Sequence, residues 1–138
     1  MKIRDFAVKY QIQTDTIRYY EKENLLTPIR RENGYREFDE ECEKQIRLII
    51  VLKQLGFTIK EIQQLLLLRD NKSISTECKD TTVLLFDQKI MKLEEKVRFY
   101  QQALKVVRTI KELVSDVKYL ENIDDIEKLV LSLFQKDL

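Results

Sequence analysis

The first forty residues alternate between helical periodicity and short breaks. A short amphipathic helix is predicted by four apolar residues at i, i+3, i+4 and i+7, namely Ile3, Phe6, Ala7 and Tyr10. Thr14 is a candidate N-cap, because its hydroxyl can accept from a free backbone N–H, and we expect a second helix from there to about Asn24. Two short helices with a tight connection predict a helix-turn-helix.

The helical periodicity is lost after Leu26. Asn33-Gly34 is a strong signal for a two-residue hairpin turn, since both residues tolerate the positive φ that a type I′ turn demands. We therefore expect a small β-hairpin over Thr27 to Phe38 that carries several arginines. The aromatic residues Phe6, Tyr20 and Phe38 are expected in the core and not on a surface that stacks nucleic-acid bases.

Capping signals then delimit two more helices. Asp39 is a good N-cap for a third helix, which we expect to end at Gly56, a C′ glycine. Thr58 and Glu61 have the spacing of a capping box and predict the start of a fourth helix. The polar stretch from Asn71 to Thr76 has no periodicity and is the one plausible hinge.

A long stretch of strict heptad spacing follows this hinge. Eight apolar residues alternate at intervals of three and four: Val83, Phe86, Ile90, Leu93, Val97, Tyr100, Leu104 and Val107. This strip, the heptad seam, is too narrow and too long to find an intramolecular partner of matching length. We expect it to pair with a second copy of the chain in a homodimer, as a parallel or antiparallel coiled coil.

The last predicted element is a short amphipathic helix from Ile123 to Phe134. The 138 residues thus predict a mainly α fold: a helix-turn-helix domain with a hairpin (1–75), a coiled-coil dimerisation helix (76–117) and a short C-terminal helix in an effector or packing segment (118–138). About 25 residues are too few for a separate ligand-binding domain. Side chains of this segment fit either a pocket for a small apolar effector or plain packing: Tyr119, Val130, Leu133 and Phe134.

The net charge of the whole chain is uninformative, but the net charges of its regions differ. The whole chain has 25 Lys and Arg against 24 Asp and Glu, a net charge of +1. Residues 1–36 hold eight basic and five acidic side chains, a net of +3, whereas residues 76–138 hold 11 and 12, a net of −1. The basic excess lies on the helix-turn-helix and hairpin, where contacts to DNA phosphates would be needed.

The absence of histidine removes several classes of chemistry. Without His the chain has no Ser-His-Asp or Cys-His constellation and no ordinary zinc site, and it has no Gly-rich phosphate loop. We therefore expect neither an enzyme nor a cofactor. Two cysteines, no signal peptide and no run of 18 apolar residues lead us to expect a soluble, cytoplasmic protein without a membrane partner.

Several linked motifs resemble one known family. Thr16-Ile17-Arg18-Tyr19-Tyr20-Glu21 precedes Leu25-Leu26-Thr27-Pro28, and Arg30-Arg31-Glu32-Asn33-Gly34-Tyr35-Arg36 follows. Leu55-Gly56-Phe57-Thr58 with Glu61-Ile62 continues the pattern. Over residues 1 to about 70 the chain resembles the DNA-binding half of MerR-type transcription regulators, and the heptad helix is similar in kind.

The resemblance implies a winged helix-turn-helix whose second helix enters the major groove while the hairpin wing contacts the flanking backbone. The planar guanidinium of arginine can donate two hydrogen bonds to a phosphate, and the free N–H groups at a helix N-terminus attract a phosphate. The double-stranded DNA contacts so implied lie on the second helix, the wing and a second wing at the start of the fourth helix: Thr14, Thr16, Arg18, Tyr19, Arg30, Tyr35, Arg36 and Lys60.

The resemblance also implies a mechanism. Members of the family bind, as antiparallel coiled-coil dimers, to a pseudo-palindrome between promoter elements that are spaced too far apart. They bend and untwist the DNA and so act indirectly on RNA polymerase. The signal is left open: a small-molecule effector is one hypothesis, and a protein partner that docks on the C-terminal segment is the alternative.

The two cysteines bear on the nature of that signal. In metal-sensing members a cysteine at the start of the dimer helix pairs with cysteines in a later loop. Cys78 has the first of these positions, but residues 79–138 contain neither Cys nor His, so the chain cannot complete a tetrahedral soft-metal site. Cys78 is interpreted as a small residue at a helix start, with a sensor thiol as the alternative. Cys42 is expected at the surface.

Overall fold

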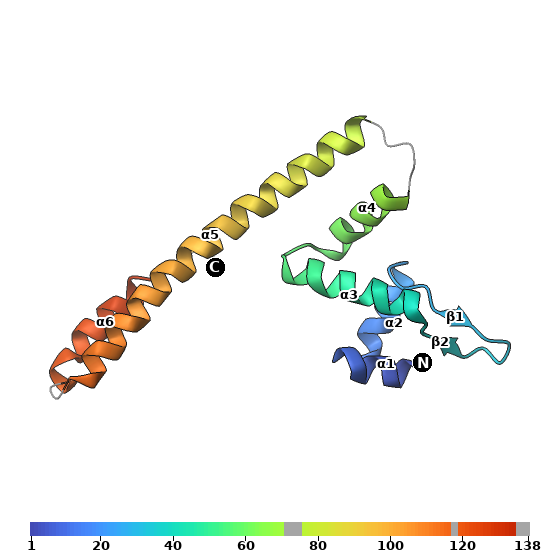
Figure 1. Cartoon of the computed structure of the whole chain (residues 1–138). Coiled ribbons are helices and arrows are strands. Elements are labelled where there is room, and N and C mark those ends of the chain that lie inside the picture. Colours follow the sequence, from blue (N-terminus) through green and yellow to red (C-terminus); the bar gives the residue numbers. More distant parts are fainter. Residues whose placement is uncertain (71–75, 117–118, 135–138) are drawn as a thin grey trace. The chain divides into compact units, whose positions relative to one another are not determined.

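A computed structural model describes residues 1–70, 76–116 and 119–134 (Figure 1). Its elements in chain order are α1 (Ile3–Tyr10), α2 (Thr14–Lys22), β1 (Ile29–Arg30), β2 (Arg36–Glu37), α3 (Glu40–Gln54), α4 (Ile59–Asp70), α5 (Thr76–Ser115), the 3-10 helix η1 (Tyr119–Asn122) and α6 (Ile123–Leu131). They confirm the mainly α fold. The predicted hinge lies outside the described residues, apart from Thr76, which begins α5. The chain divides into two compact units, Met1–Lys89 and Ile90–Leu138.

The connection between α1 and α2 is tight, as expected for a helix-turn-helix. Gln11 adopts the left-handed conformation with φ 54°, and the Ile12 N–H donates to the Ala7 carbonyl at 3.0 Å. The prediction that Thr14 caps α2 is wrong. Gln13 is the extended N-cap residue, with no side-chain cap hydrogen bond, and its carbonyl already accepts from the Ile17 N–H at 3.1 Å. The helix therefore begins one residue earlier, and Thr14 lies inside its first turn.

The predicted hairpin is present, but its turn differs. β1 and β2 pair antiparallel, with Ile29 opposite Glu37 and Arg30 opposite Arg36. The Gly34 N–H donates to the Arg31 carbonyl at 2.8 Å, and the Arg31 N–H donates to the Tyr35 carbonyl at 2.9 Å, which closes a three-residue loop. Gly34 has φ 82° whereas Asn33 is not in the positive-φ region. The two-residue type I′ turn is thus wrong: a single left-handed glycine is enough for a three-residue loop.

Three predicted caps are confirmed by hydrogen bonds. Asp39 accepts from the Cys42 N–H at 3.1 Å at the start of α3. At its end Gly56, with φ 94°, donates to the Lys53 carbonyl, and Phe57 donates to the Leu52 carbonyl, the two bonds of a Schellman motif. The capping box forms in both directions: the Thr58 N–H donates to Glu61 Oε1 at 2.8 Å, and the Glu61 N–H donates to Thr58 Oγ1 at 3.2 Å.

The core of the first unit is built from all its helices and the hairpin. Phe6 and Phe38 are buried and stacked, with ring centroids 4.6 Å apart, and Tyr20 packs against the same cluster. These aromatic residues are therefore in the core, as predicted. The expectation that Cys42 lies at the surface is wrong: it is fully buried, on the same face of α3 as Ile46, and burial raises the pKa of its thiol to about 11.

Two faces of α5 have different surroundings. Thr82, Leu85 and Lys89 are buried within the Met1–Lys89 unit. The heptad seam is largely exposed along the described chain, with only Leu93 half-buried. At ~1.5 Å per residue, the 40 residues of α5 span about 60 Å.

In the second unit, η1 and α6 turn back along the C-terminal part of α5 (Figure 1). α6 ends at Leu131 and not at Phe134, because Ser132 to Phe134 form a turn. Its inner face is half-buried at Ile126 and Leu129. The side chain of Tyr119 lies outside the described residues. None of the described helices is long and apolar enough to cross a membrane.

Candidate nucleic-acid interface

Helix α2 has one buried face and one polar face. Ile17 is fully buried and fixes the helix against the core, while Thr14 and Thr16 are half-buried, and Arg18 and Tyr19 are exposed. Arg18 Nη1 donates to Asp15 Oδ1 at 2.9 Å, between two exposed side chains. Exposed ion pairs contribute little free energy, so Arg18 can exchange this partner for a DNA phosphate or base.

Two of the wing arginines, Arg30 and Arg36, meet at a single carboxylate of α2, whereas Arg31 pairs with Glu37. Arg30 Nη2 donates to Glu21 Oε1 at 3.2 Å, and Arg36 Nε donates to Glu21 Oε2. The Glu21 side chain is mostly buried, so these two ion pairs join β1 and β2 to α2. Tyr35 stands at the tip of the wing and is 69% exposed. Glu21 thus joins the wing to α2, the helix that carries Arg18 and Tyr19.

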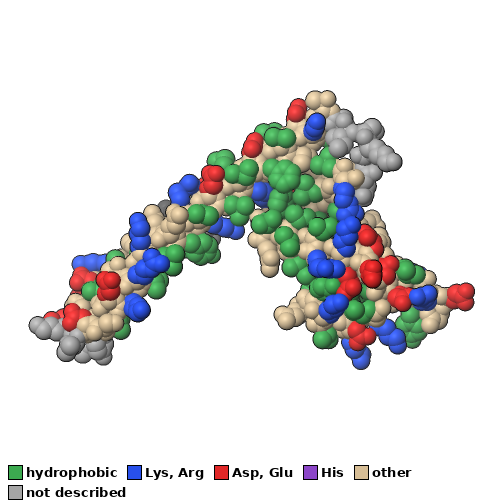
Figure 2. Space-filling model, viewed as in Figure 1, with side chains coloured by type: hydrophobic (Ala, Val, Ile, Leu, Met, Phe, Trp, Pro, Cys, Tyr) green, Lys and Arg blue, Asp and Glu red, His purple; other side chains and the backbone are tan. Residues whose placement is uncertain are grey.

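Sequence reasoning missed Glu21 as the residue that assembles this surface. It occurs in the family-like motif, but nothing in its local sequence shows that residues 9 and 15 positions later bind it. Lys60 is placed apart from the others, exposed in the first turn of α4. The basic surface is not continuous: Figure 2 shows Lys and Arg side chains interspersed with Asp and Glu over this unit.

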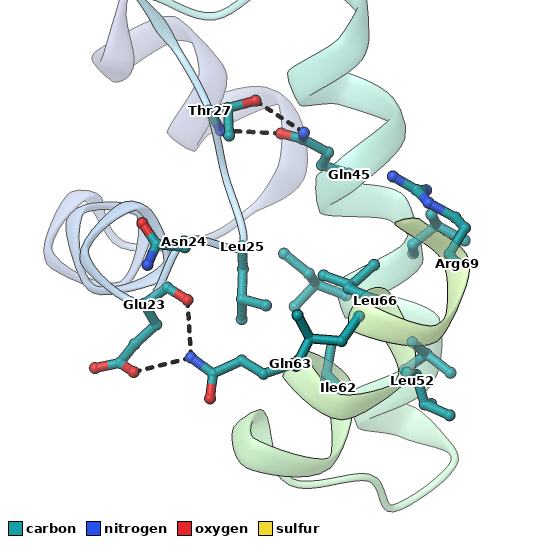
Figure 3. A pocket seen from close by; sticks show the side chains of 14 residues that line it. Glu23, Asn24, Leu25, Thr27, Gln45, Leu52, Ile62, Gln63, Leu66 and Arg69 are labelled. Atoms are coloured by element: carbon teal, nitrogen blue, oxygen red, sulfur yellow. Dashed lines mark hydrogen bonds between the residues drawn. The ribbon is translucent and has the colours of Figure 1, made fainter. Parts of the chain in front are cut away.

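A hollow of about 600 Å³ lies between the end of α2, α3 and α4 (Figure 3). Its wall is mostly apolar, with Leu25 and Leu66 pointing inward. Two pairs of its residues are joined by hydrogen bonds: Gln45 exchanges two bonds with Thr27, at 2.9 and 3.0 Å, and Gln63 Nε2 donates to the Glu23 carbonyl at 2.8 Å. These bonds hold the segment at the end of α2 against α3 and α4. None of the predicted DNA contacts lines the hollow.

The start of α5 also contacts this unit through a lysine that the sequence did not single out. Lys89 Nζ donates to the Gly56 carbonyl at 2.8 Å and forms an ion pair with Glu61 Oε1 at 3.0 Å. Heptad spacing places Lys89 beside the seam, but nothing in that spacing indicates that the α3–α4 turn buries the lysine side chain.

Cys78 is exposed in the first turn of α5, where its carbonyl accepts from the Thr82 hydroxyl at 2.8 Å. Over residues 1–70, 76–116 and 119–134, no group of three or more His, Cys, Asp or Glu side chains is arranged to hold a metal ion.

Two family models together match residues 1–110. The model described as "MerR HTH family regulatory protein" matches residues 1–68, and the model described as "MerR, DNA binding" matches residues 44–110.

Curated relatives include the mercuric resistance operon regulatory protein of Bacillus cereus, 30% identical over 118 residues, which are 85% of this chain and 82% of that protein. The HTH-type transcriptional regulator CueR of Yersinia pestis is 33% identical over 104 residues, which are 74% of this chain and 72% of that protein.

Two solved structures share the fold. One is HiNmlR, a MerR family regulator lacking the sensor domain, solved bound to promoter DNA; the TM-score is 0.65 at 20% identity, over 98% of both chains. The other is a MerR family transcriptional regulator from Bacillus cereus, with a TM-score of 0.55 at 23% identity, over 96% of this chain and 97% of that one.

Proposed function

Because the chain belongs to the MerR family of DNA-binding transcription regulators, we propose that it binds a pseudo-palindromic promoter operator as a homodimer and regulates transcription by distorting the DNA. The observation that carries the proposal is the joining of wing and recognition helix at Glu21. It holds the wing, which carries Arg30, Tyr35 and Arg36, against α2, which carries Arg18 and Tyr19.

Each side chain of this surface has a chemical role suited to DNA. The arginines supply planar, charged forks for phosphate oxygens or for a guanine edge. The tyrosines supply a hydroxyl and an apolar ring that suit the sugar-phosphate backbone. Thr14 and Thr16 lie at the N-terminal end of α2, where free backbone N–H groups attract a phosphate. Lys60 adds a second backbone contact from the start of α4.

The exposed heptad seam supports the dimer. A row of apolar side chains along a 40-residue helix is a surface that a second copy covers in a coiled coil. The charges beside the seam favour the antiparallel orientation. In a parallel coil the opposite-charge pair would join Lys89 to Glu94 of the partner subunit. Lys89 is instead already bound to Gly56 and Glu61. In an antiparallel coil centred between Val97 and Tyr100, Asp87 would face Arg108 of the partner subunit.

DNA distortion would follow from joining two DNA-binding units through one dimer. Each unit would bind its own half-site, and the separation that the dimer imposes would be matched by bending and untwisting the DNA between them. HiNmlR, the related regulator of similar fold, is a precedent for promoter binding without a sensor domain. RNA polymerase would then respond to the changed promoter geometry.

The signal follows one of two routes. A small effector is the first, and control by a protein partner on the C-terminal segment is the second. The second is favoured by the exposed apolar side chains Ile123, Val130, Leu131 and Phe134 at the end of the chain. Deleting the chain after Ser115 separates the routes: loss of a partner with an unchanged ligand response supports the second. For Cys78 the test is Cys78→Ser, which abolishes the response only if the thiol is the sensor.

Genome-wide mapping of bound DNA tests the proposed function. We expect the wild-type chain to occupy a small number of promoters, each with an inverted repeat, and Arg18→Ala to lose most of this occupancy at equal protein level. Arg98→Ala, which removes an exposed arginine of α5 outside the Met1–Lys89 unit, is the matched control and should keep it. Occupancy without a shared sequence, or occupancy unaffected by Arg18→Ala, would contradict the proposal.

A further inference from the structure

Lys89 is a buried cation inside the DNA-binding unit. It is 8% exposed, and its ammonium has three neighbours. Nζ donates to the Gly56 carbonyl at 2.8 Å, pairs with Glu61 Oε1 at 3.0 Å and lies 5.3 Å from the centre of the Phe57 ring. A buried ammonium is tolerated only when its hydrogens are bound and its charge is paired. An apolar residue could fill the same space, so packing alone does not account for a lysine here.

The partners of Lys89 lie at the two ends of the α3–α4 turn. Gly56 is the left-handed residue that ends α3, and Glu61 belongs to the capping box that begins α4. Burial acts to raise the pKa of Glu61, but hydrogen bonds from Thr58 and the Lys89 ammonium outweigh it, so the pKa lies below its ordinary value. Glu61 is therefore ionised near neutral pH. One side chain of α5 thus fixes the turn that precedes Lys60.

The same stretch of α5 has apolar contacts that do not depend on the ion pair. Leu85 belongs to the buried core cluster, and Phe86 contacts Phe57 edge to face at 5.9 Å between ring centres. These contacts hold α5 on the unit but tolerate small shifts, because apolar packing has little directional preference. The bonds of Lys89 are directional, and they define the position of α5 relative to the turn.

We propose that Lys89 is a positioning residue that fixes the dimer helix on the DNA-binding unit and thereby sets the half-site separation that the dimer accepts. The proposal rests on the proposed function, since it requires two DNA-binding units in one dimer. α5 is one continuous helix that carries both Lys89 and the heptad seam. A shift of α5 at Lys89 would therefore move each DNA-binding unit relative to the dimer, and the distance between half-sites is a geometric property of that assembly.

Spacer variants of an operator test the proposal. The probes are a duplex that the wild-type chain selects from a random-sequence library, versions with one or two base pairs added or removed at its centre, and a single half-site. We expect the wild-type chain to prefer its own spacing by about tenfold or more. Lys89→Met should lose about fivefold or more of this preference. Its affinity for the single half-site should stay within about twofold of the wild-type value.

Two further variants separate positioning from stability. Lys96→Met removes an exposed lysine one heptad later on α5 and should leave the preference unchanged. Glu61→Gln keeps a residue that can complete the capping box but removes the charge partner of Lys89. It should relax the preference as Lys89→Met does, and the double variant should add nothing further. If Lys89→Met does not fold, Glu61→Gln alone carries the test.

The outcomes are distinguishable. If the wild-type chain selects no duplex, the proposed function fails. If it selects an operator and Lys89→Met or Glu61→Gln keeps the wild-type spacing preference, the positioning role is wrong. The role is also wrong if these variants lose half-site and full-operator binding by the same factor, because that result shows a general loss of structure.

Discussion

Val97 lies in the middle of the heptad seam, and replacing it with aspartate tests the dimer with a single charge. Its side chain is 54% exposed on the described chain. In the proposed coiled coil that area would be covered by the partner subunit. Val97 lies beyond the Met1–Lys89 unit, so the substitution leaves the core of the DNA-binding unit intact.

The size of the effect follows from the exposed half of the valine and the charge that replaces it. Full burial of such a side chain is worth about 1.5–3 kcal/mol, so covering half of it stabilises the dimer by about 1 kcal/mol per chain and about 2 kcal/mol in total. Each aspartate adds the cost of burying an unpaired carboxylate, several kcal/mol per ion in a dry site. A combined loss of about 5 kcal/mol or more raises the dimer Kd by more than about 1,000-fold.

Sedimentation equilibrium over a concentration series measures this Kd. The wild-type chain should sediment as a dimer at micromolar concentration and Val97→Asp as a monomer. Met91→Asp is the matched control: Met91 is 62% exposed on the same helix but lies outside the seam, and its variant should stay dimeric. The seam does not form the dimer interface if Val97→Asp dimerises with a Kd close to the wild-type value, or if Met91→Asp dissociates to the same extent.

Three other predictions address binding and stability. Arg18→Ala should weaken operator binding about tenfold and reduce the slope of log affinity against log salt by about 0.9 per chain, or about 1.8 for the dimer, whereas Arg98→Ala changes neither in an anisotropy titration. Gly56→Ala should lower the free energy of unfolding by about 1 kcal/mol in urea melts, because φ is 94° there, and Gly56→Asn should lose less. The hydrogen bond from Lys9 holds the pKa of Glu43 below its ordinary 4.5. The ionised Glu43 carboxylate therefore stabilises the fold fully above pH 4.5, and this stabilisation is lost as the pH falls through the lowered pKa. Thermal melts from pH 7 to pH 3 should show a melting temperature that falls below pH 4.5, and the fall should be smaller in Glu43→Gln.

The helix ends were predictable because their signals are local. A cap is decided by one side chain and the next few backbone N–H groups, and Asp39, Gly56 and Thr58 each form the predicted bonds. The prediction of Thr14 as N-cap was wrong because Gln13 is the N-cap residue and makes no side-chain cap hydrogen bond that a sequence pattern could indicate. The predicted type of hairpin turn was wrong because one glycine is compatible with both a two-residue and a three-residue loop. The pairing of the strands decides between the two loops.

The candidate site was predictable in its residue types but not in its assembly. Motif and charge together indicated Arg30 and Arg36, yet their meeting at Glu21 is a tertiary contact that no local pattern encodes. Lys89 was missed for the same reason, since its partners lie 28 and 33 residues away in the chain. Cys42 could have been placed correctly, because it lies four residues before Ile46 and so on the same buried face of α3.

The central claim is that two copies of this chain bind one operator. The stoichiometry of the complex tests this claim. The purified chain is titrated onto a duplex that it selects from a random-sequence library, and the mass of the complex is determined by sedimentation. We expect two chains on one duplex with an inverted repeat. One chain for each duplex, or binding that is independent of sequence at physiological salt, would contradict it.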